Sequence, residues 1–233
     1  QYAFSSAKFV VDNMAALQEK YQVSNFELID SSLPAKYLRQ ISEEIIERNL
    51  KLTWYTRANV QREFKDPELV KLLAQAGLTE LYLGVESGSD RIVNLMQKMQ
   101  PGKAESLEVL DNLYANGVQP RAYSMFGFPS ETKEEMEESV EFFMELNKRY
   151  RIGVKNANQF NLVTDSPMFY DPEPYGIKNI SGSTNSNQGY GYQYEVSDGM
   201  TPQEAAKLCK KAGLFFKFPI LAYTHKKVFG RLL

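Results

Sequence analysis

Helix-like and strand-like segments alternate along this chain at intervals of roughly 30 to 40 residues. Short apolar runs predict the strands, and apolar residues at helical spacing follow most of them. We expect strands to end near residues 30, 57, 86, 127 and 163. Because repeated strand–helix–strand units form parallel sheets, this order predicts an α/β fold.

Helix boundaries are marked most clearly at two places. Asp66 is a capping residue, Pro67 suits a first turn and Gly77 a helix end. Thr132 and Glu135 have the spacing of a capping box, which predicts the start of a long helix.

The first helix is expected over residues 5–21. Its apolar residues recur at spacings of four, three and four, which predicts one buried face. The residues of this face are Val10, Met14, Leu17 and Tyr21.

Composition narrows the classes of function. The chain has 233 residues, a net charge of −2, one histidine and one cysteine, Cys209. A nucleic-acid partner is not expected without excess positive charge, and one cysteine permits neither an internal disulfide nor a cysteine-rich metal site. No apolar run is long enough for a membrane span, so we expect a cytoplasmic protein with no membrane partner.

Polar residues stand where the predicted strands end. These positions include Asp30, Arg57, Glu86 and the glycine turn at Gly127. In parallel α/β folds, ligands bind at the carboxyl ends of the strands. Carboxylates and an arginine suit a zwitterionic or ribose-bearing ligand. Asp30 as a helix cap and Arg57 as a salt-bridge partner are the structural alternatives.

Two separate motifs resemble those of a known enzyme family. They are LYLGVESGSDRIVNLMQK at residues 81–98 and MFGFPSETKEE at residues 125–135. Together they resemble the radical S-adenosylmethionine (SAM) enzymes, in the branch with cobalamin-associated and methylthiotransferase-like members. The likeness covers roughly residues 5–175, with Ser130 where the family usually has glycine.

This resemblance implies a partial (β/α)6 TIM-like barrel of parallel strands. The family's first strand and its CxxxCxxC loop are missing from this chain, which opens on the helix that would follow them. Residues 1–175 would form the barrel part, strands two to six with their helices, and residues 176–233 a C-terminal loop and helix extension. Residues 164–199, rich in Ser, Asn, Gly and Tyr, predict a long loop. We expect this loop to fold over the barrel mouth and to influence substrate choice; a surface loop without that role is the alternative.

The resemblance also implies cofactors and their contacts. SAM is the first cofactor, a 4Fe–4S cluster with ligands outside this chain is the second, and the branch admits cobalamin in a preceding domain. Asp30 corresponds to the position that binds the SAM amino group, and Arg57, Glu86 and Lys98 to ribose and carboxylate contacts. Ser87 lies beside Glu86, and the strand from Met125 to Gly127 would lie against the adenine. No metal ligand or catalytic residue is assigned.

The leading interpretation is therefore a fragment of a radical SAM enzyme, inactive without the cluster-binding segment. Its expected partners are a small-molecule or peptide substrate and the missing N-terminal segment of the parent chain. Two alternatives stay open at this point. One is a cluster-free α/β-barrel enzyme using Asp30 and Glu86 as acid and base, and the other is a non-catalytic binding domain derived from such a barrel.

Overall fold

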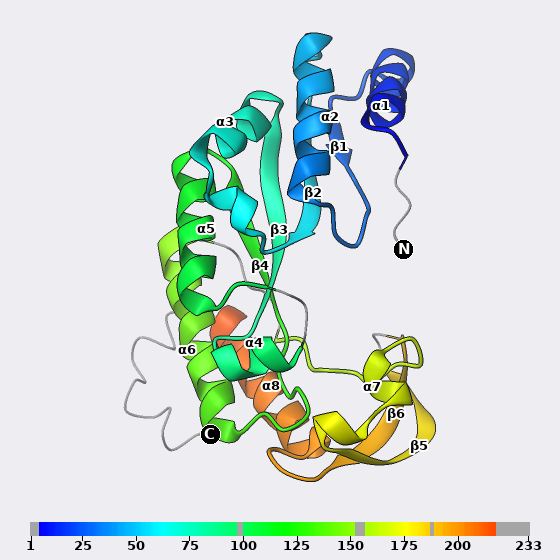
Figure 1. Cartoon of the computed structure of the whole chain (residues 1–233), viewed down its shortest axis with the longest axis vertical. Coiled ribbons are helices and arrows are strands. Elements are labelled where there is room, and N and C mark those ends of the chain that lie inside the picture. Colours follow the sequence, from blue (N-terminus) through cyan, green and yellow to red (C-terminus); the bar gives the residue numbers. More distant parts are fainter. Residues whose placement is uncertain (1–4, 97–99, 152–156, 187–188, 218–233) are drawn as a thin grey trace. The chain divides into compact units, whose positions relative to one another are not determined.

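A computed structural model describes residues 5–96, 100–151, 157–186 and 189–217 (Figure 1). The chain divides into two compact units. The first comprises residues 1–85 and 99–122, and the second residues 86–98 and 123–233. The predicted division into a barrel over 1–175 and an extension over 176–233 stays a prediction.

A four-stranded sheet runs in the order β1-β2-β3-β4. Its strands are β1 (Asn25–Glu27), β2 (Thr53–Asn59), β3 (Leu78–Glu86) and β4 (Gln119–Ser124). The β1–β2 and β2–β3 pairs are parallel. This confirms the predicted α/β fold and agrees with a partial barrel of parallel strands.

Three strand ends differ from their predicted positions. β1 ends at Glu27, before Asp30, and β4 ends at Ser124, before Gly127. β2 continues to Asn59, two residues beyond Arg57. The polar residues proposed as strand tips therefore lie partly in the loops that follow and partly within a strand.

The helices of the first unit are α1 (Ala7–Tyr21), α2 (Ala35–Glu47), α3 (Pro67–Gln75) and α5 (Lys103–Ala115), with a 3-10 turn η1 (Arg62–Lys65). Side chains alternate along β2, so Trp54, Thr56 and Ala58 are buried while Tyr55 and Arg57 on the opposite face are half-buried. The Trp54 indole Nε1 donates to the Ala76 carbonyl at 2.9 Å, which joins the buried face of β2 to the end of α3.

Of the four residues predicted for the buried face of α1, only Met14 is buried, and Val10 is half-buried. Leu17 and Tyr21 are 43% and 58% exposed, whereas Val11 and Met14 are buried. Among the described helices, α1 packs mainly against α2 (Figure 1). Only a narrow strip of its side chains is therefore buried.

The second unit contains α4 (Asp90–Leu95), α6 (Lys133–Tyr150), α7 (Pro167–Tyr170), a 3-10 turn η2 (Glu173–Tyr175), β5 (Ile177–Ser186), β6 (Gly189–Val196) and α8 (Pro202–Lys217). The predicted capping box of α6 is present. Thr132 Oγ1 accepts from the Glu135 amide at 3.2 Å, and the Glu135 carboxylate accepts from the Thr132 amide at 3.0 Å.

The prediction of a long loop over residues 164–199 is wrong. Strands β5 and β6 form an antiparallel hairpin beside α7 (Figure 1). Ile177 and Tyr194 of this hairpin share a buried core with Phe128, Phe160 and Leu162. The burial of these apolar side chains supports the strands despite a polar composition.

The last predicted strand, near residue 163, is reduced to two isolated bridges. Phe126 pairs with Gln159 in a parallel bridge, and Leu162 pairs with Tyr192 in an antiparallel one. Over the described residues, no helix combines the length and the apolar character needed to cross a bilayer.

Candidate functional site

Strand β3 ends in a buried turn, the Glu86 turn (residues 86–89). Glu86 has φ of +68° and is 7% exposed. Its carbonyl accepts from the Met125 amide at 2.7 Å. A left-handed conformation is uncommon for a residue with a side chain. A nearly buried carboxylate residue in this conformation marks a position whose geometry the surrounding structure imposes.

The Glu86 turn is held against helix α6 by serine hydroxyls. Ser87 Oγ and Ser139 Oγ lie 2.8 Å apart, and Ser139 Oγ accepts from the Gly88 amide at 2.9 Å. Ser87 Oγ also accepts from the Ser89 amide at 3.1 Å. A side chain at Gly88 would come within 2.9 Å of both Phe142 Cβ and Ser139 Cα, so only glycine fits this contact.

A second turn follows β4, the Gly127 turn (residues 127–131). Gly127 has φ of +72°, and a Cβ there would lie 2.5 Å from Ala205 Cβ of α8. The Gly127 amide donates to the Glu131 carboxylate. Ser130 adopts φ of +69°, a second left-handed residue that is not glycine. Both motif segments thus fold into turns with backbone conformations that most side chains avoid.

Glu131 is completely buried in the Gly127 turn. Its Oε1 atom has no hydrogen-bond partner within the part of the chain that the structure describes. Burial raises the pKa of the Glu131 carboxyl to about 7, and the Gly127 amide opposes this shift. The group is therefore poised between its protonated and ionised forms near neutral pH.

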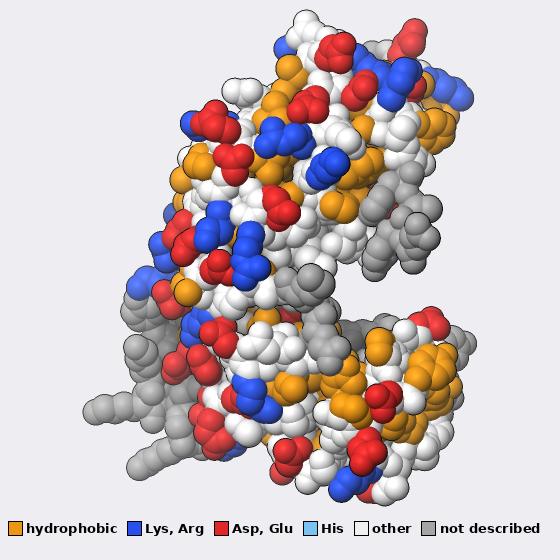
Figure 2. Space-filling view, in the orientation of Figure 1, with side chains coloured by type: hydrophobic (Ala, Val, Ile, Leu, Met, Phe, Trp, Pro, Cys, Tyr) orange, Lys and Arg blue, Asp and Glu red, His pale blue; other side chains and the backbone are white. Residues whose placement is uncertain are grey.

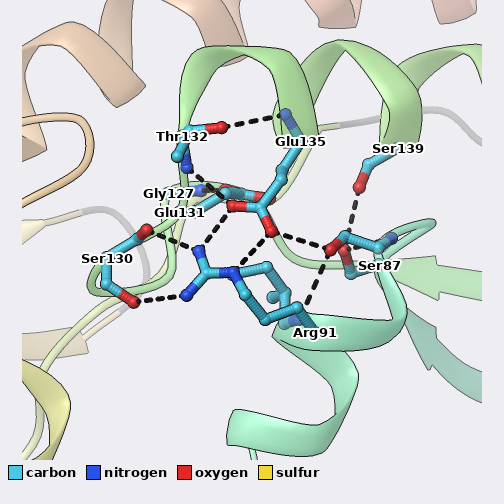
Figure 3. Close-up of polar contacts among 10 residues, drawn as sticks. Ser87, Arg91, Gly127, Ser130, Glu131, Thr132, Glu135 and Ser139 are labelled. Carbon is cyan, nitrogen blue, oxygen red and sulfur yellow. Dashed lines mark hydrogen bonds and ion pairs between the residues drawn. The ribbon is translucent and has the colours of Figure 1, made fainter.

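Glu135 lies four residues further along, in the first turn of α6, and has the opposite environment (Figure 3). Arg91 approaches its carboxylate as a fork, with Nε at 2.7 Å from Oε1 and Nη2 at 2.5 Å from Oε2. Hydrogen bonding from Arg91 lowers the pKa of Glu135 to about 2, and the Ser89 hydroxyl and the Thr132 amide act in the same direction. Glu135 is thus ionised across the physiological range.

The structure brings four of the predicted site residues into the second unit. Glu86, Ser87, Met125 and Gly127 lie in or beside the two turns. The Ser87 hydroxyl is engaged by Ser139 and the Ser89 amide, so its observed contacts are within the protein. That these residues contact a cofactor stays a prediction.

Two of the other predicted residues, Asp30 and Arg57, lie in the first unit. Asp30 is exposed in the first unit, after β1. Arg57 Nη2 is 2.6 Å from Glu27 Oε1, and Glu27 also accepts from the Tyr55 hydroxyl at 2.7 Å. The salt-bridge alternative for Arg57 is therefore present, in a strand rather than a loop. Lys98 lies outside the described residues.

Sequence reasoning assigned no role to Arg91, Glu131 or Ser139. Arg91 lies inside the first quoted motif, and its acidic partner Glu135 lies inside the second, so their opposite charges were the available signal. Ser139 follows the capping-box Glu135 by four residues, on the same face of a helix. A small polar residue at that spacing indicates a close contact with another backbone.

The donor atoms of this chain do not fit an iron–sulfur cluster. Among the described residues, no group of three or more His, Cys, Asp or Glu side chains could hold a metal ion. Cys209 is buried, and burial raises the pKa of its thiol to about 12, which disfavours the thiolate. That a polar organic ligand such as SAM binds at the two turns stays a prediction, which rests on the Glu86 carboxylate and on the glycines of both turns.

Comparison with known proteins supports the family assignment. The sequence matches the family model of the Radical SAM superfamily over residues 11–143, more than half of the chain. An uncharacterized methyltransferase of Pyrococcus horikoshii is 26% identical over 165 residues, covering 70% of this chain and 34% of that protein. An anaerobic magnesium-protoporphyrin IX monomethyl ester cyclase of Rubrivivax gelatinosus is 26% identical over 148 residues, covering 63% of this chain and 26% of that protein.

A solved structure has the same fold. A radical S-adenosylmethionine methyltransferase from Kitasatospora setae, with cobalamin and a 4Fe-4S cluster bound, superposes with a TM-score of 0.62 at 18% identity. The match covers 85% of this chain and 40% of that chain. The chain thus spans only about a quarter to two fifths of the length of these proteins. Because the family model matches more than half of its residues, the chain belongs to the radical SAM superfamily, a family of enzymes.

Proposed function

We propose that this chain supplies a SAM-binding part of a radical SAM enzyme. The observation that carries the proposal is the pair of adjoining turns, each with a buried glutamate and a left-handed residue that is not glycine. The bond from the Met125 amide to the Glu86 carbonyl links them at 2.7 Å. Strained backbone held by many contacts is typical of sites where a ligand must be oriented.

In this proposal each residue has a binding role. Glu86 accepts hydrogen bonds from the ribose hydroxyls or the ammonium of SAM, and the half-buried Met125 lies against its adenine. The contacts predicted for Asp30, Arg57 and Lys98 stay predictions. SAM supplies radical or methyl-transfer chemistry when bound, while the protein binds it, orients it and limits access of water.

Methyl transfer to a small-molecule or peptide substrate is the reaction that we favour. The Pyrococcus relative and the Kitasatospora protein are both named methyltransferases, and the Kitasatospora structure holds cobalamin. Cobalamin in another part of the parent enzyme would be consistent with that reaction. The β5–β6 hairpin is our candidate for influencing substrate choice, since it shares its core with Phe128 of the Gly127 turn.

Removal of the Glu86 carboxylate tests the proposal. In the enzyme that carries its iron–sulfur cluster, Glu86→Ala should weaken SAM binding about 10-fold to 100-fold, the value of one hydrogen-bonded charge. Isothermal titration with SAM measures the dissociation constant. Glu141→Ala, at an exposed position of α6 in the same unit, is the control and should leave it unchanged. Equal SAM affinity in wild type and Glu86→Ala would contradict the assignment.

A further inference from the structure

We propose that Arg91 is a positioning residue, which fixes the Glu86 turn and the Gly127 turn against each other for SAM binding. The part of the inference that concerns SAM rests on the proposed function. The fixing of the turns does not, because it follows from contacts within the second unit alone (Figure 3).

Arg91 reaches the Gly127 turn from helix α4, which begins directly after the Glu86 turn. Its Nη2 atom donates to the Ser130 carbonyl at 2.7 Å, and Nη1 donates to Ser130 Oγ at 3.3 Å. These two contacts hold the residue that has φ of +69°. A side chain disfavours this conformation, so the turn needs such external support.

Glu135 holds Arg91 in place and contacts both the Glu86 turn and the residue that follows the Gly127 turn. Its Oε1 atom accepts from the Ser89 hydroxyl at 3.0 Å, and its Oε2 atom accepts from the Thr132 amide at 3.0 Å. The Glu135 side chain is 17% exposed and the Arg91 side chain 48%, so solvent reaches the pair mainly from the arginine side. One carboxylate thus connects the end of the Glu86 turn, the guanidinium of Arg91 and the residue that follows the Gly127 turn.

The contacts require the shape of arginine as well as its charge. Three guanidinium nitrogens are used at once, Nε and Nη2 for Glu135 and Nη1 and Nη2 for Ser130. A lysine ammonium is a single point and cannot span both partners. Arg91→Lys therefore keeps the charge while it removes the link that Arg91 makes between the two turns.

Both turns carry predicted SAM contacts, at Glu86 and Gly127, but Arg91 itself is assigned none. Loosening of the turns would displace those contacts without removing a ligand group. A displacement of about 1 Å is enough to weaken an oriented interaction considerably. Arg91 thus acts through other residues.

Backbone amide exchange and SAM affinity test this inference in Arg91→Lys and Glu135→Gln. The reporting amides are those of Gly88, Gly127 and Thr132. They donate to the side chains of Ser139, Glu131 and Glu135, respectively, in or beside the two turns. Arg48→Lys is the matched control, because Arg48 also forms a fork with a glutamate, Glu44, through Nε and Nη2 at 3.1 and 2.6 Å, in the first unit.

We expect exchange at the three amides to rise about tenfold in Arg91→Lys, corresponding to one lost charge-assisted contact. SAM binding to the cluster-containing enzyme should weaken by a similar factor, and Arg48→Lys should change neither quantity. Unchanged amide exchange in Arg91→Lys would show that Arg91 does not fix the two turns against each other, whatever the affinity for SAM. Faster exchange with unchanged SAM affinity would overturn the positioning role. Absence of SAM binding by the wild-type enzyme would overturn the proposed function, and the positioning role with it.

Discussion

Glu131 and Glu135 stand four residues apart, yet their carboxyl pKa values move in opposite directions. The pKa of Glu131 is raised to about 7, because the carboxyl is buried with few partners. The pKa of Glu135 is lowered to about 2, because Arg91 and two further donors stabilise the carboxylate. The charge on Glu135 also contributes to the raised pKa of Glu131. The same residue type therefore serves as a near-neutral acid and as a fixed anion within one motif.

This contrast predicts how unfolding depends on pH. A raised folded-state pKa stabilises the fold fully below the ordinary value of 4.5, and that contribution is lost as pH rises towards about 7. The loss amounts to about 3 kcal/mol. Glu131→Gln should abolish this loss, because an amide keeps an acceptor for Gly127 and does not titrate. Denaturant unfolding of wild type and variant from pH 4 to 8, about the range set by the two pKa values, measures the difference.

Glu135 supplies the opposite control when the same measurement is extended down to about pH 2. Its lowered pKa stabilises the fold above 4.5, and that contribution is lost as pH falls towards about 2. Glu135→Gln should therefore flatten the acid limb. It should also shorten the limb between pH 4.5 and 7 without abolishing it, because the Glu135 charge contributes to the raised pKa of Glu131 while burial is its main cause. Parallel stability curves for wild type and Glu131→Gln would show that burial does not perturb Glu131 as described.

At the scale of elements, the hairpin β5–β6 belongs to the same core as the Gly127 turn. The Phe160 ring lies 5.3 Å from the Phe128 ring and 6.0 Å from the Tyr194 ring, both edge to face. Tyr194 is 8% exposed, whereas Tyr170 of α7 is 74% exposed. Figure 2 shows hydrophobic side chains on the surface over α7 and the hairpin. Burial, more than aromatic content, identifies which of these tyrosines supports the hairpin.

Two tyrosine substitutions should therefore differ in their effect. Tyr194→Ala should lower the free energy of unfolding by about 3 kcal/mol, because it removes a buried ring from the shared core. Tyr170→Ala should change it by less than about 0.5 kcal/mol. Hydrogen exchange at the Phe160 amide, which donates to the Phe126 carbonyl at 2.8 Å, should rise only in Tyr194→Ala. Similar destabilisation by both substitutions would argue against a core role for the hairpin.

The sequence predicted elements best where local signals decide the structure. The Asp66 cap and the Thr132–Glu135 capping box both form as expected, since they depend on neighbours within one helical turn. The hairpin was missed because its polar composition outweighed the alternation in YQYEV. The buried face of α1 was predicted wrongly because the number of elements that pack against a helix decides how many of its apolar residues are buried. That number depends on tertiary structure.

At the scale of the whole molecule, the site was predictable in part. Glycine-rich motifs after two apolar runs predicted turns that carry a site, and both turns are present in the second unit. The network of Arg91, Glu135 and Ser130 joins residues about forty positions apart. Sequence spacing alone cannot predict such a contact, because the contact depends on how the chain folds. Asp30 and Arg57 fall in the first unit, so their predicted contribution to SAM binding remains for experiment.

The cysteine content of the whole chain determines whether it can hold an iron–sulfur cluster. A 4Fe–4S cluster is held by cysteine thiolates, and this chain has one cysteine. The Cys209 thiol is buried, and its pKa is raised to about 12, so it is protonated at neutral pH. Anaerobic reconstitution of this chain with iron and sulfide should therefore leave no stable cluster absorption and no cleavage of SAM. Cys209→Ala is the control and should give the same spectrum as wild type. Four tightly bound irons per chain, lost in Cys209→Ala, would contradict this expectation and would show that Cys209 is a ligand together with groups that are not cysteine.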